Sequence, residues 1–334
     1  KVELNESQSV QAGIVDGQIV YSDSVLDRTN TLFSLLNPIN GEDSNYLMLV
    51  PEAQLWDKVY AEAASYYNYG NINKADSLQQ YNAHMALFRN MLFNRNIGGR
   101  HINDSIYSIS FNPLATGDDR HYVFYKPFEA GGILSSAFVR DTMEASNGVF
   151  YNLYQWPFEP SEIYHFPVKG EGENTALVTS TPTRCRRTYT YTSADSISGG
   201  FVTISPTSSS NVDWEIEYDI HDVLSGTYDI CAVVLPYSVT GNANVKPIKF
   251  SASVNYQNET GATLSMDLSE DNISDPEHVD TISLGTFKVP VCTYGQTESK
   301  LSVVLSCQFR GTDRKNYDGR MLLDCIYLKP SKEE

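Results

Sequence analysis

The chain has 334 residues, of which 41% are hydrophobic and 12% aromatic, a composition that can bury substantial cores and excludes wholesale disorder. Its 41 acidic and 24 basic residues give a net charge of -17, which disfavours binding to nucleic acid and docking on anionic lipid through a basic patch. No apolar run approaches the roughly 20 residues of a membrane span, so we expect none.

The first clear elements are a strand that leads through a proline into a helix. The residues 46–50 form a continuous apolar run of the length of a buried strand, and Pro51 interrupts it. The apolar residues then recur at helical spacing until about Tyr67, where Asn68 and Gly70 break the pattern. The residues on this predicted helical face are Trp56, Val59, Tyr60, Ala63 and Tyr67.

A second helix is predicted directly afterwards. Asp76 can cap it, and Gln79 follows three residues later, as in a capping box. One apolar stripe follows, at steps of three and four, through Leu78, Tyr81, Met85, Phe88 and Leu92. Strand patterns then occupy 105–111, 121–126 and 148–154.

Two motifs of this first half resemble those of fasciclin domains. That family has a strand leading into V-P-x-x-x-A-[FW], and here "LVPEAQLWDKV" (49–59) supplies Val50, Pro51 and Trp56, with Leu55 where Ala is usual. The family's closing motif resembles "SNGVFYNLYQWPF" (146–158). The likeness covers roughly residues 15–160, and the chain here is similar to secreted fasciclin-domain proteins of Bacteroidetes.

The resemblance implies a fold more strongly than a partner. Asn90 and Met91 stand where the family often has the Tyr-His pair associated with adhesion, and Tyr151 replaces the His of the closing motif. We therefore expect an α+β fasciclin-like domain over residues 1–160 and carry over no binding residue.

The second half has a different periodicity. A segment punctuated by Pro and Gly is predicted as a linker over 161–183, and helix signals almost vanish beyond it. Strict alternation in 212–218, 248–256 and 301–309 predicts strands, so we expect an all-β sandwich or jelly roll over 184–334.

This half is similar to the galactose-binding-like β-sandwiches that serve as carbohydrate-binding modules. The stretch "VDWEIEYDIHDVLSGTYDICAVVLP" (212–236) resembles their strand, loop and strand, and "MLLDCIYLKP" (321–330) resembles their last strand. Both patterns are generic for strands, and an unrelated jelly roll remains an alternative.

The five cysteines all lie in the second half and form no CxxC pair, so neither a zinc ribbon nor a thioredoxin motif is present. Cys307 occupies an inward position of an alternating strand, where a free thiol behaves as a small hydrophobe. Buried thiols are the favoured interpretation, and one or two disulfides are the alternative.

Catalytic motifs are missing from the sequence. It contains no G-x-S-x-G elbow, and its six histidines show no H-E-x-x-H spacing. A pair of glycosidase carboxylates would leave no local pattern. We predict that the protein is not an enzyme, with a glycoside-active enzyme as the least favoured alternative.

An acidic stretch offers a possible cation site. The run "DLSEDNISDPEHVD" (267–280) supplies hard oxygen ligands that suit calcium, with Asp271, Asp275 and Glu277 as the candidates. It lacks the spacing of an EF-hand, and a solvated acidic loop is the favoured alternative. No other cofactor is predicted.

Glycan binding needs aromatic faces that stack on sugar rings, flanked by polar groups. The densest aromatic cluster outside a strand is "YYNYGN" (66–71), where Tyr66 and Tyr69 are the candidates for exposure. Tyr237 and Tyr294 lie near predicted strand ends in the second half. The alternative is that these tyrosines pack in the core.

Together these observations predict a non-enzymatic protein for adhesion or for capture of a surface glycan or protein ligand. The chain opens on Lys1 and has no signal peptide, so we expect a mature or trimmed form that is extracytoplasmic, at a bacterial surface or outer membrane. A lipid anchor lost upstream is part of this expectation. The alternative is a structural subunit of a surface assembly.

Overall fold

The computed structural model describes residues 2–15, 18–28, 45–94, 104–111, 121–178, 183–192, 197, 199–208, 212–241, 246–309 and 311–331. The chain divides into two compact units that share it in alternating segments. The first contains Lys1–Lys58 and Leu87–Phe158, and the second contains Val59–Ala86 and Glu159–Glu334.

The first unit is built on a six-stranded mixed sheet with the order β8-β7-β6-β5-β10-β9. Its neighbouring strands β5 and β10 run parallel, with Gly148 opposite Tyr46 and Leu153 opposite Pro51. The first motif that resembles fasciclin domains therefore begins on β5, beside the strand β10 that carries the second, and the fasciclin assignment itself stays a prediction. The strands are β5 (Tyr46–Pro51), β6 (Leu92–Asn94), β7 (Ser105–Phe111), β8 (His121–Tyr125), β9 (Val139–Ala145) and β10 (Gly148–Leu153).

Two short antiparallel pairs precede this sheet. The strand β1 (Val2–Leu4) pairs with β4 (Leu26–Arg28), and β2 (Val10–Val15) pairs with β3 (Gln18–Asp23). Apolar side chains of the second pair are open to solvent, with exposed fractions from 42% at Val20 to 68% at Ile14.

Two helices connect the sheet strands, and each belongs partly to both units. The helix α2 (Ala53–Tyr66) follows Pro51 as expected, and its face contains the buried Val59 and Ala63. The helix α3 (Ala75–Phe88) starts two residues earlier than a cap at Asp76 predicts, because the Leu78 N–H donates to the Lys74 carbonyl (3.0 Å). Gln79 forms no capping box and instead donates to the carbonyl of Ala64 (2.8 Å). In the described residues, no helix combines the length and the apolar character that a membrane crossing requires.

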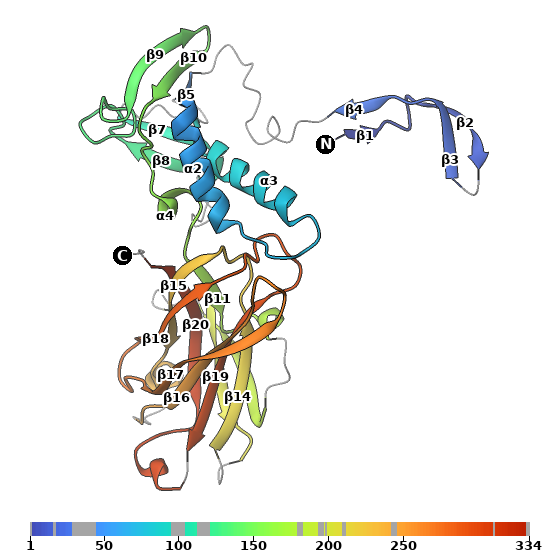
Figure 1. Ribbon diagram of the computed structural model, residues 1–334. Coiled ribbons are helices and arrows are strands. Elements are labelled where there is room, and N and C mark those ends of the chain that lie inside the picture. The colour runs from blue at the N-terminus through green and yellow to red at the C-terminus, as the bar shows by residue number, and fades with distance from the viewer. Residues whose placement is uncertain are drawn as a thin grey trace. The chain divides into compact units, whose positions relative to one another are not determined.

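The second unit contains a β-sandwich whose two sheets lie face to face (Figure 1). One sheet has the order β12-β13-β20-β15-β18, with β11 also paired to β20, and the other has the order β14-β19-β16-β17. The first sheet consists of β11 (Val168–Glu171), β12 (Cys185–Tyr191), β13 (Gly200–Pro206), β15 (Gly226–Val234), β18 (Asp280–Val289) and β20 (Met321–Pro330). The second consists of β14 (Val212–Asp219), β16 (Lys249–Gln257), β17 (Thr263–Ile273) and β19 (Leu301–Phe309).

The alternating strands fill the space between the sheets as the sequence pattern predicts. The inward face of β14 carries Trp214 and Tyr218, and both side chains are buried in one large apolar core. Cys307 of β19 also lies in this core. All five cysteines are free thiols, and burial raises the pKa of Cys307 to about 12.

The segment 161–183, expected as a linker, contributes to the sandwich. The strand β11 pairs with β20, and the short helical turn η1 (Thr175–Leu177) follows it. Of the Pro and Gly residues that favoured a linker, Gly170 lies within β11, and Pro167 and Gly172 flank it. The short helix α4 (Pro160–Ile163) precedes β11, and two further turns, η2 (Tyr237–Thr240) and η3 (Asp313–Lys315), lie between sandwich strands.

Candidate functional site

A groove of about 800 Å³ lies in the second unit, where the end of α2 meets the sandwich. Two chain segments far apart in sequence form it. Residues 62–68 come from the end of α2 and the loop after it, and residues 225–290 come from β15, β16, β17 and β18. We call this feature the Tyr66–Tyr256 groove, after the two aromatic residues in its lining.

Tyr66 is held in place by its neighbours on the sandwich. It is the last residue of α2, and its backbone carbonyl accepts a hydrogen bond from the Ser225 N–H (2.8 Å). Its ring lies 4.5 Å from the ring of His165 and 5.5 Å from that of Tyr164. The half-buried ring is therefore fixed on one side and lines the groove with the rest of its surface.

Tyr256 supplies the second aromatic ring from β16. Its centroid lies 4.9 Å from that of Phe287 on β18, so a buried ring supports it. Leu264 is its register partner on β17 and is 43% exposed. The groove therefore continues past Tyr256 onto an apolar side chain that is open to solvent.

The polar lining combines amides, carboxylates and one ammonium group. Glu62, Glu259 and Lys288 have exposed side chains, and Asn68 and Asn258 are half-buried. These groups can donate and accept hydrogen bonds next to the two rings.

The turn between β16 and β17 is tightly organised. Asn258 Oδ1 accepts hydrogen bonds from the N–H groups of Thr260 (3.1 Å) and Ala262 (2.9 Å) and from the Thr260 hydroxyl (2.8 Å). Gly261 adopts a φ of +86°, a conformation that favours glycine. The turn therefore presents Glu259 from a defined backbone.

The loop after α2 fastens this turn. Asn68 Nδ2 donates to Glu259 Oε1 (2.9 Å), and Asn71 Nδ2 donates to the carbonyl of Thr260 (2.8 Å). The Asn68 carbonyl in turn accepts from the Cys292 N–H (2.6 Å). The groove is thus assembled by hydrogen bonds between segments about 190 positions apart.

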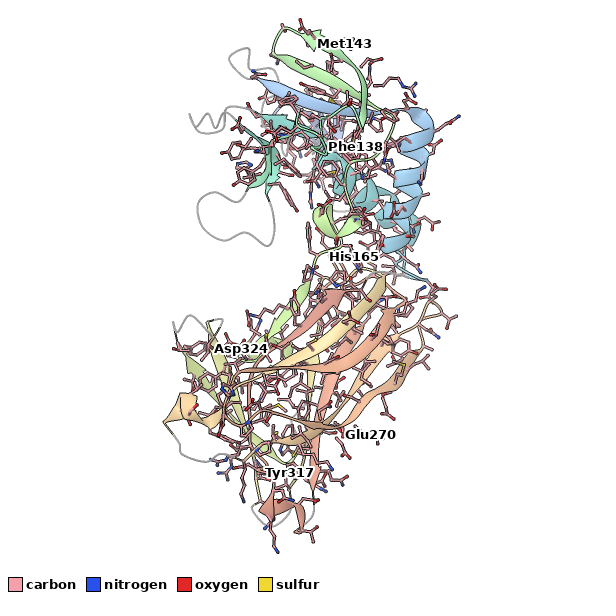
Figure 2. All side chains as sticks on the ribbon, turned by 90° about the vertical axis from the view of Figure 1, so that its left-hand side faces the viewer. Phe138, Met143, His165, Glu270, Tyr317 and Asp324 are labelled. Atoms are coloured by element: carbon pink, nitrogen blue, oxygen red, sulfur yellow. The ribbon has the colours of Figure 1, made fainter. Side chains whose placement is uncertain are left out.

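His165 supports the floor beneath Tyr66. It precedes β11 in the chain and is labelled in Figure 2; it is 4% exposed, with its ring also 4.9 Å from that of Tyr228. Burial lowers its pKa from the ordinary value to about 4, so the imidazole is neutral near pH 7. A Cβ atom on Gly226 would lie 3.1 Å from His165 Nε2, so this close packing requires glycine.

The structure brings one of the four predicted tyrosines into the groove. Tyr66 lines it, whereas Tyr69 is 2% exposed, with its hydroxyl donating to the Tyr294 carbonyl (3.0 Å) and accepting from Asn82 (2.6 Å). Tyr294 is half-buried beside Tyr67 and is not part of the lining. Tyr69 therefore offers no face to a ligand, because the loop turns its ring inward.

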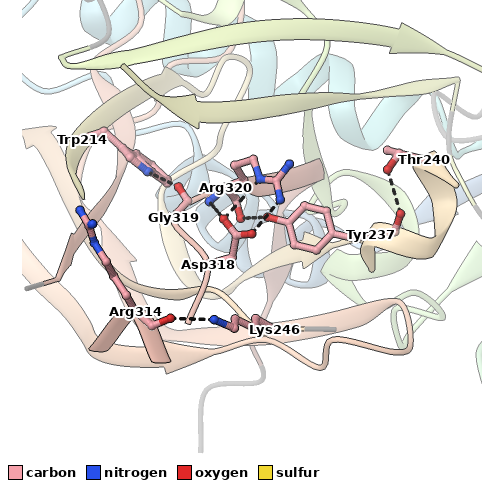
Figure 3. Close-up of polar contacts among 8 residues, drawn as sticks. All are labelled: Trp214, Tyr237, Thr240, Lys246, Arg314, Asp318, Gly319 and Arg320. Atoms are coloured by element: carbon pink, nitrogen blue, oxygen red, sulfur yellow. Dashed lines mark hydrogen bonds and ion pairs between the residues drawn. The ribbon is translucent and has the colours of Figure 1, made fainter. Parts of the chain in front are cut away.

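Tyr237 is also buried rather than displayed. It is 6% exposed and belongs to a small apolar cluster with Leu235 and Leu322. Its hydroxyl donates to the Arg320 carbonyl, and the Arg320 guanidinium lies 4.9 Å from the ring centroid (Figure 3). Arg320 is held in turn by Asp318 (2.8 Å). This tyrosine therefore anchors a loop.

The predicted calcium ligands do not converge. Asp271 forms an ion pair with Lys249 (2.8 Å), and Glu277 is exposed. Asp275 accepts from the N–H groups of Glu277 and His278, and these hydrogen bonds lower its pKa below the usual range. Among the residues that the structure describes, no three His, Cys, Asp or Glu side chains gather as a metal site. The residues therefore do not fit calcium.

The sequence did not point to Asn68, Tyr256, Glu259 or Lys288 as site residues. The segment 258–261, Asn-Glu-Thr-Gly, does read as a turn between two strand patterns, since Asn and Gly favour turns. No sequence pattern around Glu259 identifies it as a groove residue, because its position there depends on Asn68.

No family model matches the chain, and no curated protein matches it in sequence. Solved structures that match include a GH26-CBM35 mannanase of Podospora anserina, with a TM-score of 0.28 and 14% identity over 51% of this chain and 29% of that chain. A family 35 carbohydrate-binding module from Clostridium thermocellum matches with a TM-score of 0.30 and 12% identity, over 50% of this chain and 99% of that one. The CBM22-2 xylan-binding domain from Paenibacillus barcinonensis matches with a TM-score of 0.32 and 9% identity, over 50% and 99%. The assignment of a β-sandwich rests on the strand pairing described above, and the galactose-binding-like family stays a prediction.

Proposed function

We propose that this chain is a non-enzymatic binding protein that captures glycans in the Tyr66–Tyr256 groove. The observation that carries the proposal is the lining itself, in which two half-buried rings stand beside amide, carboxylate and ammonium groups. Sugar rings stack on aromatic faces, and their hydroxyls both donate and accept hydrogen bonds. The groove volume lies within the range of small-molecule and cofactor sites.

The carboxylates of the groove favour binding over glycoside cleavage. A glycosidase acts through two carboxyl groups that flank the scissile bond in a site closed off from water. Glu62 and Glu259 both have exposed side chains, and Glu259 already accepts a hydrogen bond from Asn68. This argument supports capture without turnover.

The cellular setting is part of the same proposal. We place the protein outside the cytoplasm, displayed at a bacterial surface, because a glycan-capturing protein would meet its ligands there. Adhesion, a lipid anchor and a fasciclin-like first unit remain proposals that follow from the sequence resemblance alone.

The test is binding of the full chain to an array of oligosaccharides, followed by calorimetry on each hit. We expect at least one glycan to bind, and we expect Tyr256→Ala to weaken it by about tenfold, the scale of a stacked ring. Tyr191→Ala is the matched control, since Tyr191 is 72% exposed and lies outside the groove lining. No binding on the array, or equal losses in both variants, overturns the proposal.

A second candidate function is assembly with other proteins. The exposed apolar residues of β2 and β3, among them Ile14, Val15 and Ile19, lie on an isolated strand pair of a kind that is only marginally stable in water. A structural subunit would cover these side chains on association.

A further inference from the structure

Asn68 has no side-chain proton left to donate to a ligand. Its Nδ2 donates to Glu259 Oε1 (2.9 Å) and to the Pro290 carbonyl (3.1 Å), and its Oδ1 accepts from the Gly70 N–H (3.0 Å). Both amide protons are therefore used within the protein. The side chain lines the groove and orients the groups around it.

Glu259 is the group that Asn68 orients. One carboxylate oxygen receives the Asn68 amide, and within the described residues the other oxygen has no hydrogen-bond partner. The side chain is exposed and lines the groove. An ionised carboxylate only accepts hydrogen bonds, so any ligand group that meets it must be a donor.

The charges of the groove also favour ligands that are not anionic. Two carboxylates, Glu62 and Glu259, face one ammonium group, Lys288, among the described residues of the lining. The net charge of these groups is negative, and the net charge of the whole chain is -17. Such a field repels anions and has no such effect on neutral hydroxyls.

Resting on the proposed function, we propose that the groove selects neutral, hydroxyl-rich glycans and rejects glycans that carry carboxylate or sulfate. In this proposal Glu259 is the hydrogen-bond acceptor that determines specificity, and Asn68 is the residue that positions it. The fixed turn places the acceptor before the ligand arrives, because Asn71 and the bonds within 258–262 hold the backbone. A pre-ordered acceptor costs little conformational entropy on binding.

The test compares neutral with anionic probes on the full chain. The neutral probes are xylohexaose, mannohexaose and cellohexaose, and the anionic probes are oligogalacturonate and oligomannuronate of equal length. Affinities are measured by calorimetry at about 0.02 M and about 0.5 M salt, since salt screens charge repulsion. The variants are Glu259→Gln and Asn68→Ala, and the control is Glu270→Gln, an exposed glutamate of β17 outside the lining (Figure 2).

We expect the wild type to bind a neutral hexasaccharide and no anionic one at low salt. Glu259→Gln should lower the affinity for the neutral probe by about tenfold to a hundredfold, the scale of a hydrogen bond to a charged group. The difference in affinity between neutral and anionic probes should become smaller. Asn68→Ala should weaken the neutral probe less, and the control should match the wild type. Melting temperatures are measured for each variant, because a loss of fold would lower both kinds of binding together.

Three results overturn this inference. Preferential binding of the anionic probes refutes the selectivity and leaves glycan capture standing. A Glu259→Gln variant that behaves like Glu270→Gln refutes the role of Glu259. No binding of any glycan refutes the proposed function and the inference with it.

Discussion

Asn68 and Glu259, 191 positions apart in the chain, are joined by a hydrogen bond of 2.9 Å. One partner follows a helix of the first half of the sequence, and the other lies at the tip of a hairpin of the β-sandwich. The bond has two consequences. It joins two groups of the groove lining, and it adds to the contacts between the segment 59–86 and the sandwich, which lie in the same compact unit.

A truncation tests this relationship. The fragment 166–334 contains every sandwich strand but lacks Glu62, Tyr66 and Asn68, so we expect it to lose glycan binding. It should also unfold at a lower temperature than the full chain, because the loop after α2 no longer covers the β16–β17 turn. Calorimetric binding and thermal melts measured by circular dichroism check both expectations.

The control for that truncation is the fragment 45–334. It lacks β1 to β4, which pair only with one another in the described sheets, and it keeps the whole groove. We expect it to bind as the full chain does. Full binding by 166–334 would contradict the assembly of the groove from two segments.

The sheets of the sandwich are the part of the fold that the sequence predicts well. Alternation at 212–218, 248–256 and 301–309 is a local pattern, and β14, β16 and β19 follow it closely. The strand, proline and helix at 46–67 are likewise predicted, since Pro51 and the helical spacing act locally.

The groove could not be predicted in the same way. Tyr66 is found because aromatic residues are dense around it, and Tyr69 and Tyr237 look equally suitable in the sequence. Only tertiary packing turns those two rings inward. Glu259 has no local mark at all, because its role depends on a residue 191 positions away.

The helix start at Ala75 shows how tertiary contacts override a local rule. Asp76 and Gln79 have the spacing of a capping box, yet Asp76 lies inside the first turn. Gln79 reaches the Ala64 carbonyl on the neighbouring helix instead. A carbonyl on another helix therefore decides where this side chain bonds.

A core substitution should affect stability and leave glycan affinity unchanged. Trp214 is buried, and its Nε1 donates to the Gly319 carbonyl (2.7 Å; Figure 3). Trp214→Phe leaves that carbonyl without a donor and opens a cavity, so we expect a loss of about 2 to 4 kcal/mol in the free energy of unfolding. Urea denaturation measures this loss.

A matched variant separates the two causes. Tyr218→Phe removes a longer hydrogen bond, from the hydroxyl to the Gly172 carbonyl (3.3 Å), and keeps the ring in the core. We expect a cost of about 1 kcal/mol. Glycan affinity should match the wild type in both variants, since neither residue lines the groove. Equal losses of unfolding free energy in Trp214→Phe and Tyr218→Phe would contradict the expected extra cost of the cavity and of the shorter hydrogen bond at Trp214.

The exposed strand pair β2–β3 is expected to drive self-association or partner binding if the chain is an assembly subunit. Replacing Ile14 and Ile19 by Thr keeps strand propensity and removes apolar surface that is 68% and 50% exposed. The variant should sediment as a smaller species than the wild type at equal concentration. Identical sedimentation of both proteins as monomers would count against assembly through this pair, and glycan binding should be unaffected in either case.

The stability of the second unit should depend on pH through His165. Its pKa is lowered by burial to about 4 in the folded state, against an ordinary value near 6.5. Between these values the unfolded chain binds the proton and the folded chain does not, so stability falls as the pH drops from about 6.5 to about 4. Above pH 6.5 both states are neutral and the penalty vanishes. The full penalty, reached below pH 4, is about 3 kcal/mol, since each pKa unit is worth about 1.4 kcal/mol.

The variant His165→Phe tests this assignment. It keeps an aromatic ring against Tyr66 and Tyr228 and removes the titrating group, so its unfolding free energy should fall less between pH 6.5 and 4 than that of the wild type. The difference between the two curves isolates His165, because the other titrating groups are common to both proteins. His221→Gln, which removes a histidine outside this cluster, is measured alongside as the control variant. If the curves for wild type and His165→Phe are parallel, the buried imidazole is protonated as readily as an exposed one. The conclusion that Tyr66 packs on a neutral imidazole would then be wrong.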